Sequence, residues 1–189
     1  MSCRFQEHNH AFVSEGAATR ACEVVYERGQ PARVTSSLHG LKVMKTTQSA
    51  FVGFVDDEFR SLPDMNDRVF CTIVDASWTY VTGGVRRPDY DGCWATVRDT
   101  ILQVFAGPAE RGVFSPSVQK TLHDTVQLIF ARLPLVSDVR MELPNVHAYE
   151  FDFSRLPALQ LRNEGRVFQP TDKPSGNIKA SFTRTKSRL

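Results

Sequence analysis

Five residues that lie far apart in the sequence have side chains suited to holding a flat anionic ring: Phe51, Arg68, Gln119, Asn145 and His147. A guanidinium can donate two parallel hydrogen bonds to a planar anion or to a pair of carbonyls, and an aromatic ring can stack on a flat ligand. The first turn of a helix offers free N–H groups and a positive dipole end. These residue types favour recognition of a planar, negatively charged ligand.

Each of the five also has an ordinary structural explanation that the residues alone leave open. The arginine could form a surface ion pair with Asp64 or Asp67, the glutamine could simply begin a helix, and the phenylalanine could belong to the core. Asn145 and His147 could be hydrogen-bonded polar groups at the end of a strand.

The histidine belongs to the run "LPNVHAYEFDF", residues 143–153, which has the alternation of a strand. In an extended chain one face carries Asn145, His147, Tyr149, Phe151 and Phe153. We expect this aromatic face to be buried. An amide and an imidazole at its end then need hydrogen-bond partners or a ligand.

Other chemistries lack their usual sequence signals. The chain contains no H-E-x-x-H pair, no Walker or Rossmann glycine pattern and no G-x-S-x-G elbow. The remaining histidines have no acidic or thiolate companions nearby, so we interpret them as surface or strand-edge residues and not as metal ligands: His8, His10, His39 and His123.

The composition is that of an ordinary globular protein. The chain has 189 residues, of which 41% are hydrophobic and 23% charged, enough to bury one sizeable core. Its net charge of +2 is scattered, so we predict no nucleic-acid partner. No apolar run approaches a membrane span and no secretory signal begins the chain, so we predict no membrane partner. The cysteines form no C-x-x-C pair and are interpreted as reduced, mostly core residues: Cys3, Cys22, Cys71 and Cys93.

The hydrophobic pattern predicts strands, then two helices, then strands. Extended segments are expected at 10–13, 21–27, 40–51 and 68–80, and in the last of these the even-numbered residues from Phe70 to Tyr80 share one bulky face. A helix is expected from Asp89 to the "AGP" stop at 106–108, and a second one follows, with Ser115 as its cap and Pro116 in its first turn. Strands are expected at 136–143, 146–153 and 176–184. This order favours an α+β fold with an antiparallel sheet covered on one face by a helix pair.

Two features lie at the ends of the chain. The strand within "HNHAFV", residues 8–13, has no evident hairpin partner upstream, so we interpret it as the last strand of a preceding unit. The chain closes on Ser187, Arg188 and Leu189, a small-basic-leucine ending like the peroxisomal address S-K-L. A polar tail without such a role is the alternative.

Several fragments in the right order resemble urate oxidase (uricase), namely "LKVMKTTQSAFVGF", "DRVFCTIVDASWTY", "GVFSPSVQKTL", "LPNVHAYEFD" and the ending "SRL". The resemblance covers nearly the whole chain. It implies the tunnelling fold (T-fold), in which two strand-strand-helix-helix-strand-strand units follow one another in each subunit. It also implies that full-length subunits form a homotetramer.

The resemblance also implies a division of the chain. Residues 1–17 would contain the last strand of a truncated first T-fold unit, residues 18–184 the second unit, and residues 185–189 a peroxisomal targeting tail read by the import receptor. Localisation in the peroxisome follows from that tail.

Carried over position by position, the resemblance implies a role for each site residue. Phe51 resembles the residue that stacks on the purine, Arg68 and Gln119 the pair that grips its two edges, and the Val118 amide a further donor. Asn145 resembles the amide that holds dioxygen or water above the ring, and His147 the imidazole of a proton relay. The reaction implied is oxidation of urate by dioxygen to 5-hydroxyisourate and hydrogen peroxide.

No metal or organic cofactor is implied, because a desolvated, oriented and deprotonated urate is electron-rich enough to react with dioxygen itself. Two departures from the family pattern stand out. Ala148 follows the histidine where relatives usually have an aromatic residue, and the catalytic lysine and threonine of the family belong to the first unit, with no match here. A catalytically silent fragment and a T-fold protein that binds another purine or a pterin therefore remain alternatives.

Overall fold

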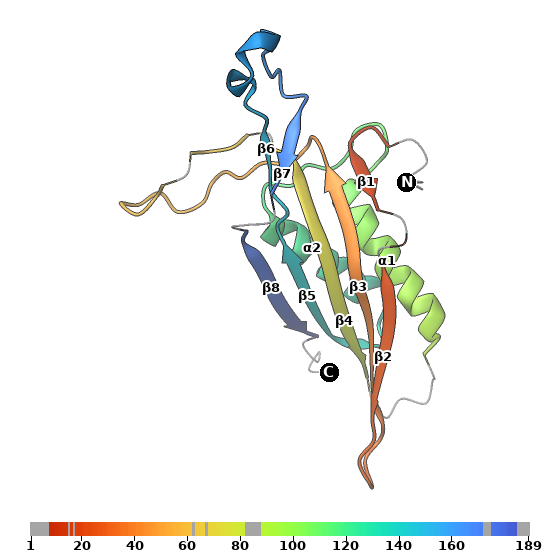
Figure 1. The fold of residues 1–189 in the computed structure, drawn as a ribbon. Helices are drawn as coiled ribbons and strands as arrows, with labels where there is room; N and C mark the ends of the chain where they lie inside the picture. The colour runs from red at the N-terminus through yellow and green to blue at the C-terminus, as the bar shows by residue number, and fades with distance from the viewer. Residues whose placement is uncertain are drawn as a thin grey trace.

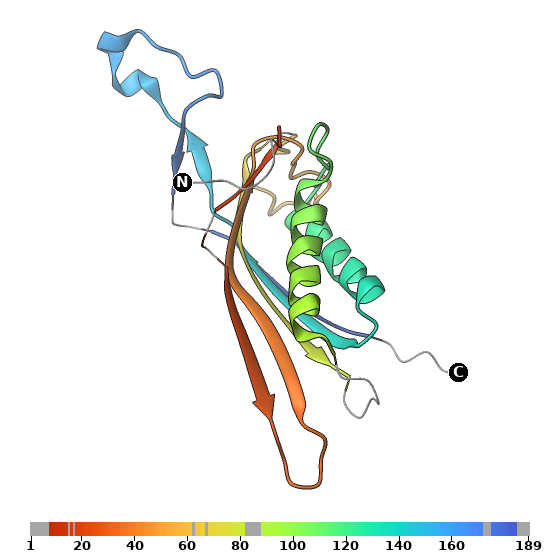
Figure 2. The same cartoon turned by 90° about the vertical axis from the view of Figure 1, so that its right-hand side faces the viewer.

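One twisted antiparallel sheet forms the body of the protein, and two helices cover one of its faces (Figures 1 and 2). The computed structural model describes residues 8–14, 16, 18–61, 63–66, 68–81, 88–171 and 175–184. The order of the main strands is β1-β3-β4-β5-β8, and β2 pairs with β3 beyond the end of β1. Their bounds are Ala11–Val13 for β1, Thr19–Val25 for β2, Arg33–Lys45 for β3, Phe70–Tyr80 for β4, Val136–Pro144 for β5 and Asn177–Thr183 for β8.

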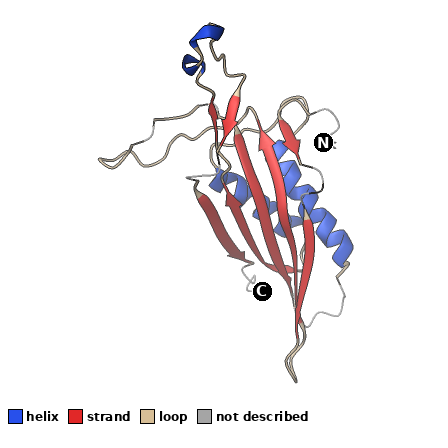
Figure 3. Ribbon diagram, viewed as in Figure 1, coloured by secondary structure: helices blue, strands red, loops and turns tan. Residues whose placement is uncertain are grey.

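The predicted architecture is confirmed: an antiparallel α+β sheet with a helix pair on one face. Figure 3 shows the two long helices grouped together behind the strands. The expected N-terminal strand is β1, and it pairs with the second half of β3 in the same sheet. Its assignment to a preceding unit, and the domain boundaries at 17 and 184, stay predictions. Ser187, Arg188 and Leu189 lie outside the described residues.

Strand β4 is the centre of the sheet, and its sequence explains why. The residues predicted to share a face are all buried, at 4% exposure or less: Phe70, Thr72, Val74, Ala76, Trp78 and Tyr80. Two of them carry polar atoms that are satisfied inside the core. Trp78 Nε1 donates to the Tyr80 hydroxyl at 2.9 Å, which lies 3.1 Å from Ser36 Oγ. This face packs against the helices because alternation puts all of its bulk on one side.

Helix α1 (Tyr90–Ala106) begins at Asp89, whose side chain accepts a hydrogen bond from the Gly92 N–H. Helix α2 (Val118–Arg132) begins two residues later than predicted. Its N-cap is Ser117, which accepts from the Lys120 N–H, so the prediction of Ser115 as cap with Pro116 in the first turn was wrong. The backbone of Ser115 is used elsewhere, in hydrogen bonds to the segment that follows β3.

The region after β5 leaves the main sheet. Short strands β6 (Ala148–Glu150) and β7 (Phe168–Pro170) pair with each other, and the chain between them forms two 3-10 turns, η1 (Phe153–Arg155) and η2 (Pro157–Leu159). This arm projects beyond the sheet (Figure 1). The predicted continuous strand over 146–153 with a buried aromatic face was therefore wrong, since Tyr149 is 57% exposed.

The cysteine prediction is correct at two positions. Cys71 and Cys93 are buried free thiols, whereas Cys22 is an exposed free thiol on the outer strand β2, and Cys3 lies outside the described residues. Burial raises the pKa of both core thiols. A raised pKa keeps the thiols protonated and unreactive at neutral pH.

Candidate functional site

Phe51 and Arg68 come together at the end of the sheet where β3 finishes and β4 begins. The Arg68 guanidinium carbon lies 5.6 Å from the centre of the Phe51 ring and 5.5 Å from that of Phe70. Phe51 is partly exposed and stacks on Phe54, with ring centres 4.4 Å apart and planes 17° from parallel. A flat aromatic surface and a cation thus lie side by side, as the sequence prediction required.

The Arg68 side chain is partly buried, and no described residue supplies a counter-charge. Among the described residues, its Nε and Nη2 atoms are shielded from solvent and have no hydrogen-bond partner. The alternative explanation, an ion pair with Asp64, does not hold, because Asp64 pairs with Arg60 at 2.9 Å; Asp67 lies outside the described residues. Desolvation lowers the pKa of Arg68 from its ordinary value. Donors of this kind are costly to leave unpaired, which favours an acceptor ligand.

Backbone hydrogen bonds hold this pair beside the start of α2. The Arg68 N–H donates to Ser49 O at 3.0 Å, the Ala50 N–H to Ser115 O at 2.9 Å and the Ser115 N–H to Gln48 O at 2.9 Å. Segments 48–51 and 113–117 therefore run against each other. The second of these leads directly into Ser117 and α2.

The first turn of α2 carries the predicted pair Val118 and Gln119. Val118 is buried, Gln119 is exposed, and the backbone N–H groups of these two residues precede the first intrahelical hydrogen bond. The helix dipole adds partial positive charge at this point. The geometry is suited to an anionic or carbonyl oxygen near the turn.

Asn145, which directly follows β5, lies at the same end of the sheet. It forms an isolated antiparallel bridge with Thr72, and its N–H donates to Gly176 O at 2.8 Å. Residues directly opposite in an antiparallel pair point to the same face. Asn145 therefore shares the helix-covered face of β4 with Thr72, near the end of β4 that follows Arg68.

His147 lies at the base of the projecting arm. Its carbonyl accepts from the Thr171 N–H at 2.9 Å, and its ring lies 6.1 Å from that of Tyr149. It is partly buried. The structure thus gathers the predicted site residues at one end of the fold, with direct contact between Phe51 and Arg68 and the other four on adjoining segments.

Unpaired buried polar atoms gather in the same region. Among the described residues they are Ser49 Oγ, Arg68 Nε and Nη2, and Thr171 Oγ1. Ser49 is bonded through its backbone to Arg68, and Thr171 through its backbone to His147. Buried polar groups in native proteins are nearly all paired. Their concentration here makes this end of the sheet the candidate site for a polar ligand.

Sequence reasoning missed a buried lysine next to this site. Lys45, the last residue of β3, is only 1% exposed and lies opposite Phe70. The signal was present, because Leu41, Val43 and Lys45 alternate along the strand and share the buried face. Ser49 and Thr171 carried no comparable signal.

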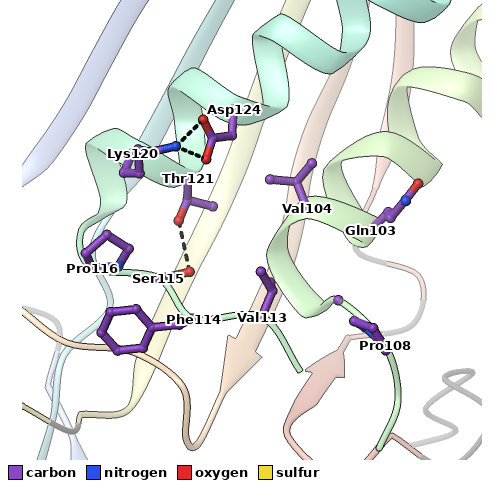
Figure 4. A pocket seen from close by; sticks show the side chains of 11 residues that line it. Gln103, Val104, Pro108, Val113, Phe114, Ser115, Pro116, Lys120, Thr121 and Asp124 are labelled. Carbon is purple, nitrogen blue, oxygen red and sulfur yellow. Dashed lines mark hydrogen bonds and ion pairs between the residues drawn. The ribbon is translucent and has the colours of Figure 1, made fainter. Parts of the chain in front are cut away.

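A separate pocket of about 480 Å³ lies on the helix side, between the end of α1 and the start of α2 (Figure 4). It is lined by Val104, Val113, Phe114 and neighbouring residues, and none of the predicted site side chains lines it. Lys120 and Asp124 form an ion pair at its edge, which lowers the pKa of Asp124, and the Thr121 hydroxyl donates to Ser115 Oγ at 3.0 Å. Because its polar groups are paired, this pocket is a weaker candidate than the region of Arg68.

In the part of the chain that the structure describes, no three His, Cys, Asp or Glu side chains cluster in a way that could hold a metal ion. None of the described helices is long and apolar enough to cross a membrane. The isolated histidines are used in local contacts. His10, for example, lies 2.6 Å from Thr47 Oγ1 and 3.0 Å from Glu110 O.

An antiparallel sheet with a helix pair on one face defines an α+β protein of the tunnelling-fold class. A family model described as "Uricase" matches residues 34–179. The chain belongs to the uricase family.

Individual relatives agree with the family match. The chain is 44% identical over 178 residues to a uricase of Danio rerio and 44% identical over 178 residues to one of Drosophila melanogaster, in each case over 94% of this chain. The crystal structure of the uricase from Arthrobacter globiformis superposes with a TM-score of 0.76 at 29% identity and covers 98% of this chain. A urate oxidase from Bacillus sp. TB-90, at 20% identity and a TM-score of 0.58, shares the fold.

The chain is shorter than these proteins. It covers 58% of the Danio rerio relative, 50% of the Drosophila melanogaster relative and 61% of the Arthrobacter globiformis chain. It thus spans roughly half to three fifths of the length of the proteins that it matches.

Proposed function

We propose that this chain supplies the ligand-gripping part of a urate oxidase site, which oxidises urate with dioxygen and water to 5-hydroxyisourate and hydrogen peroxide. The observation that carries the proposal is the Arg68 guanidinium, whose buried nitrogens have no partner among the described residues and which lies beside the Phe51 ring. An anionic purine would satisfy both features at once, by stacking on the ring and accepting from the guanidinium.

In this proposal the remaining site residues also bind and orient urate. Gln119 and the Val118 N–H hold the edge of the purine opposite Arg68, where the N-terminus of α2 favours negative charge. Asn145 holds dioxygen or water above the ring, and His147 takes part in moving the proton that urate must lose. Orientation and deprotonation by these groups are the protein's share of the catalysis, and the urate anion supplies the electrons.

The proposal extends to assembly. The family's lysine and threonine would reach the site from a further T-fold unit, within a homotetramer of full-length subunits. The described sheet is consistent with such a neighbour, because β2 and β8 each pair on only one side. Unpaired strand edges are ready to accept another strand.

Urate binding tests the proposed function directly. Titration calorimetry with urate under anaerobic conditions, which prevent oxidation, is expected to show saturable binding of one urate per site. A neutral purine without oxygen substituents should bind more weakly, because it offers no anionic acceptor to Arg68. A pterin that binds more tightly than urate would contradict the proposal and favour the other T-fold ligand class.

We propose further that the ending Ser187-Arg188-Leu189 directs the protein to peroxisomes. A fluorescent protein fused to the N-terminus, which leaves the C-terminus free, is expected to give punctate fluorescence that coincides with a peroxisomal marker. The matched control carries Leu189→Asp and should be diffuse. Diffuse fluorescence of the unmodified fusion would contradict the targeting role.

A further inference from the structure

Lys45 is a buried cation that the proposed site does not yet use. It is the last residue of β3 and is 1% exposed. Its ammonium nitrogen lies 2.7 Å from Val113 O and 5.3 Å from the centre of the Phe105 ring. Among the described residues it forms no ion pair, so its charge is balanced only by a carbonyl dipole and an aromatic face. A buried charge with so little compensation is costly and needs an explanation.

The hydrogen bond from Lys45 fixes a segment that leads to the proposed site. Val113 precedes Ser115 by two residues, and the Ser115 backbone is bonded to Gln48 and Ala50. Segment 113–117 is therefore attached at two neighbouring points, by the Lys45 side chain and by this backbone pairing. Figure 4 shows the segment passing through Ser115 and Pro116 into α2. Val118 and Gln119, in the first turn of that helix, belong to the proposed urate-binding residues.

Lys45 and Arg68 both lie near residue Phe70. Lys45 is paired with Phe70 across β3 and β4, and the Arg68 guanidinium lies 5.5 Å from the Phe70 ring. Two desolvated cations therefore lie close to the place where an anion is expected, and the N-terminus of α2 adds positive potential there. Burial lowers the pKa of Lys45 to about 8, so its charge is present at neutral pH and is lost as the pH rises through that value.

Other charged groups on the surrounding elements do not take over this role. They are His8 and His10 next to β1, Arg68 and the Cys71 thiol at the start of β4, and Glu110 and Arg111 ahead of Val113. α1 contributes the Phe105 ring at this point. None of these groups forms an ion pair with Lys45 in the part of the chain that the structure describes.

We propose that Lys45 is a positioning residue of the urate site: its ammonium group holds segment 113–117, and with it the first turn of α2, in place against Phe51 and Arg68, and its charge favours the bound anion. This inference rests on the proposed function, since it concerns the same site. Lys45 would act through its hydrogen bond to the Val113 carbonyl and through the electric field of its charge, without contact to the ligand.

The test compares urate binding, under anaerobic conditions, by the wild-type chain, K45M and the control K42M. Lys42 is on the same strand, but its side chain is exposed. K45M is expected to bind urate about three- to thirtyfold more weakly at pH 7, the range for a residue that acts through packed neighbours. K42M should bind as the wild type does.

The pH dependence of urate affinity distinguishes a role of the Lys45 charge from a role of its packing alone. As the pH rises from 7 to 9.5, wild-type affinity should fall about three- to tenfold more than that of K45M, because the attraction of the ammonium for the anion disappears. Ionisation of urate itself affects both proteins equally. Calorimetry in buffers of different ionisation enthalpy should detect uptake of about 0.3 to 0.5 proton per urate near pH 8.5 in the wild type and in K42M, but not in K45M.

The outcomes test the positioning role of Lys45 and the proposed function separately. Equal affinity of K45M and wild type, or weaker binding by K45M with unchanged proton uptake, would overturn the positioning role while the proposed function stands. Failure of the wild-type chain to bind urate would overturn both. If K45M does not fold, K45Q, which keeps a neutral donor toward Val113, takes its place and must also lose the proton uptake.

Discussion

The purified 189-residue chain is expected to oxidise urate at least about a hundred times more slowly than the same chain co-expressed with the remainder of a uricase. The reason is the proton that urate must lose. His147 is partly buried at the base of the arm. The resemblance to urate oxidases implies that the lysine and threonine of the relay belong to a further T-fold unit, so His147 would act here without them. Positioned acid-base groups typically contribute about two to four powers of ten in rate.

The measurement follows the loss of urate absorbance and the release of peroxide by the chain alone and by the chain co-expressed with the unmatched part of the Danio rerio uricase. A complemented sample with His147→Ala serves as control and should lose most of the restored rate. Size-exclusion chromatography of each sample ensures that folded protein is compared. Rapid turnover by the isolated chain would show that the catalytic base lies within these residues.

Replacement of Arg68 by alanine is expected to weaken anaerobic urate binding by about 1.5–3 kcal/mol, the range for hydrogen bonds to charged groups. Two buried nitrogens of the guanidinium have no partner among the described residues, so they are available to donate to the ligand. Arg68→Lys should recover only part of the loss, because a lysine lacks the planar fork that binds two acceptors at once.

The same substitution should leave the free energy of unfolding of the ligand-free protein unchanged or slightly higher, since Arg68 is desolvated and pairs with no carboxylate among the described residues. Arg98→Ala is the matched control. Arg98 is paired with Asp99 on the outside of α1, so its loss should alter neither urate binding nor stability by more than about 0.5 kcal/mol. Unaltered urate affinity in Arg68→Ala would rule out the clamp.

The regular elements were predictable from sequence because their signal is local and repeated. The alternation from Phe70 to Tyr80 identified the buried face of β4, and the three- and four-residue spacing of apolar positions identified both helices. The cap of α2 was not predictable in the same way. Ser115 and Ser117 are equally good cap residues by type, and the backbone of Ser115 is instead hydrogen-bonded to the distant Gln48 and Ala50.

The arm after β5 could not be predicted for a related reason. The alternation of residues 145–153 is that of a strand, yet β6 finds its partner in β7, away from the helices. With no layer above it, Tyr149 stays exposed. A pattern of alternating residues indicates a strand but does not state which neighbour will cover it.

The candidate site was predictable as a set of residues but not as a geometry. The residue types and the family resemblance selected Phe51 and Arg68, while their contact depends on loop backbone that has no periodic signal, such as the bond from Arg68 N–H to Ser49 O. Lys45 was overlooked because a lysine in a strand is usually taken to face solvent. Its place in the alternation with Leu41 and Val43 would have been the better guide.

The end of α1 places a limit on how this protein can be redesigned. Gly107, at φ +73°, closes the helix, and a methyl group added there would lie 2.7 Å from both Gly112 C and Val113 N. Backbone therefore touches backbone just ahead of the carbonyl that receives Lys45. Loops usually tolerate inserted residues well, but an insertion between 107 and 113 would displace that carbonyl. Residues 107–113 thus form a stretch of fixed length, and fusions or grafts belong on the projecting arm, where the chain contacts little else.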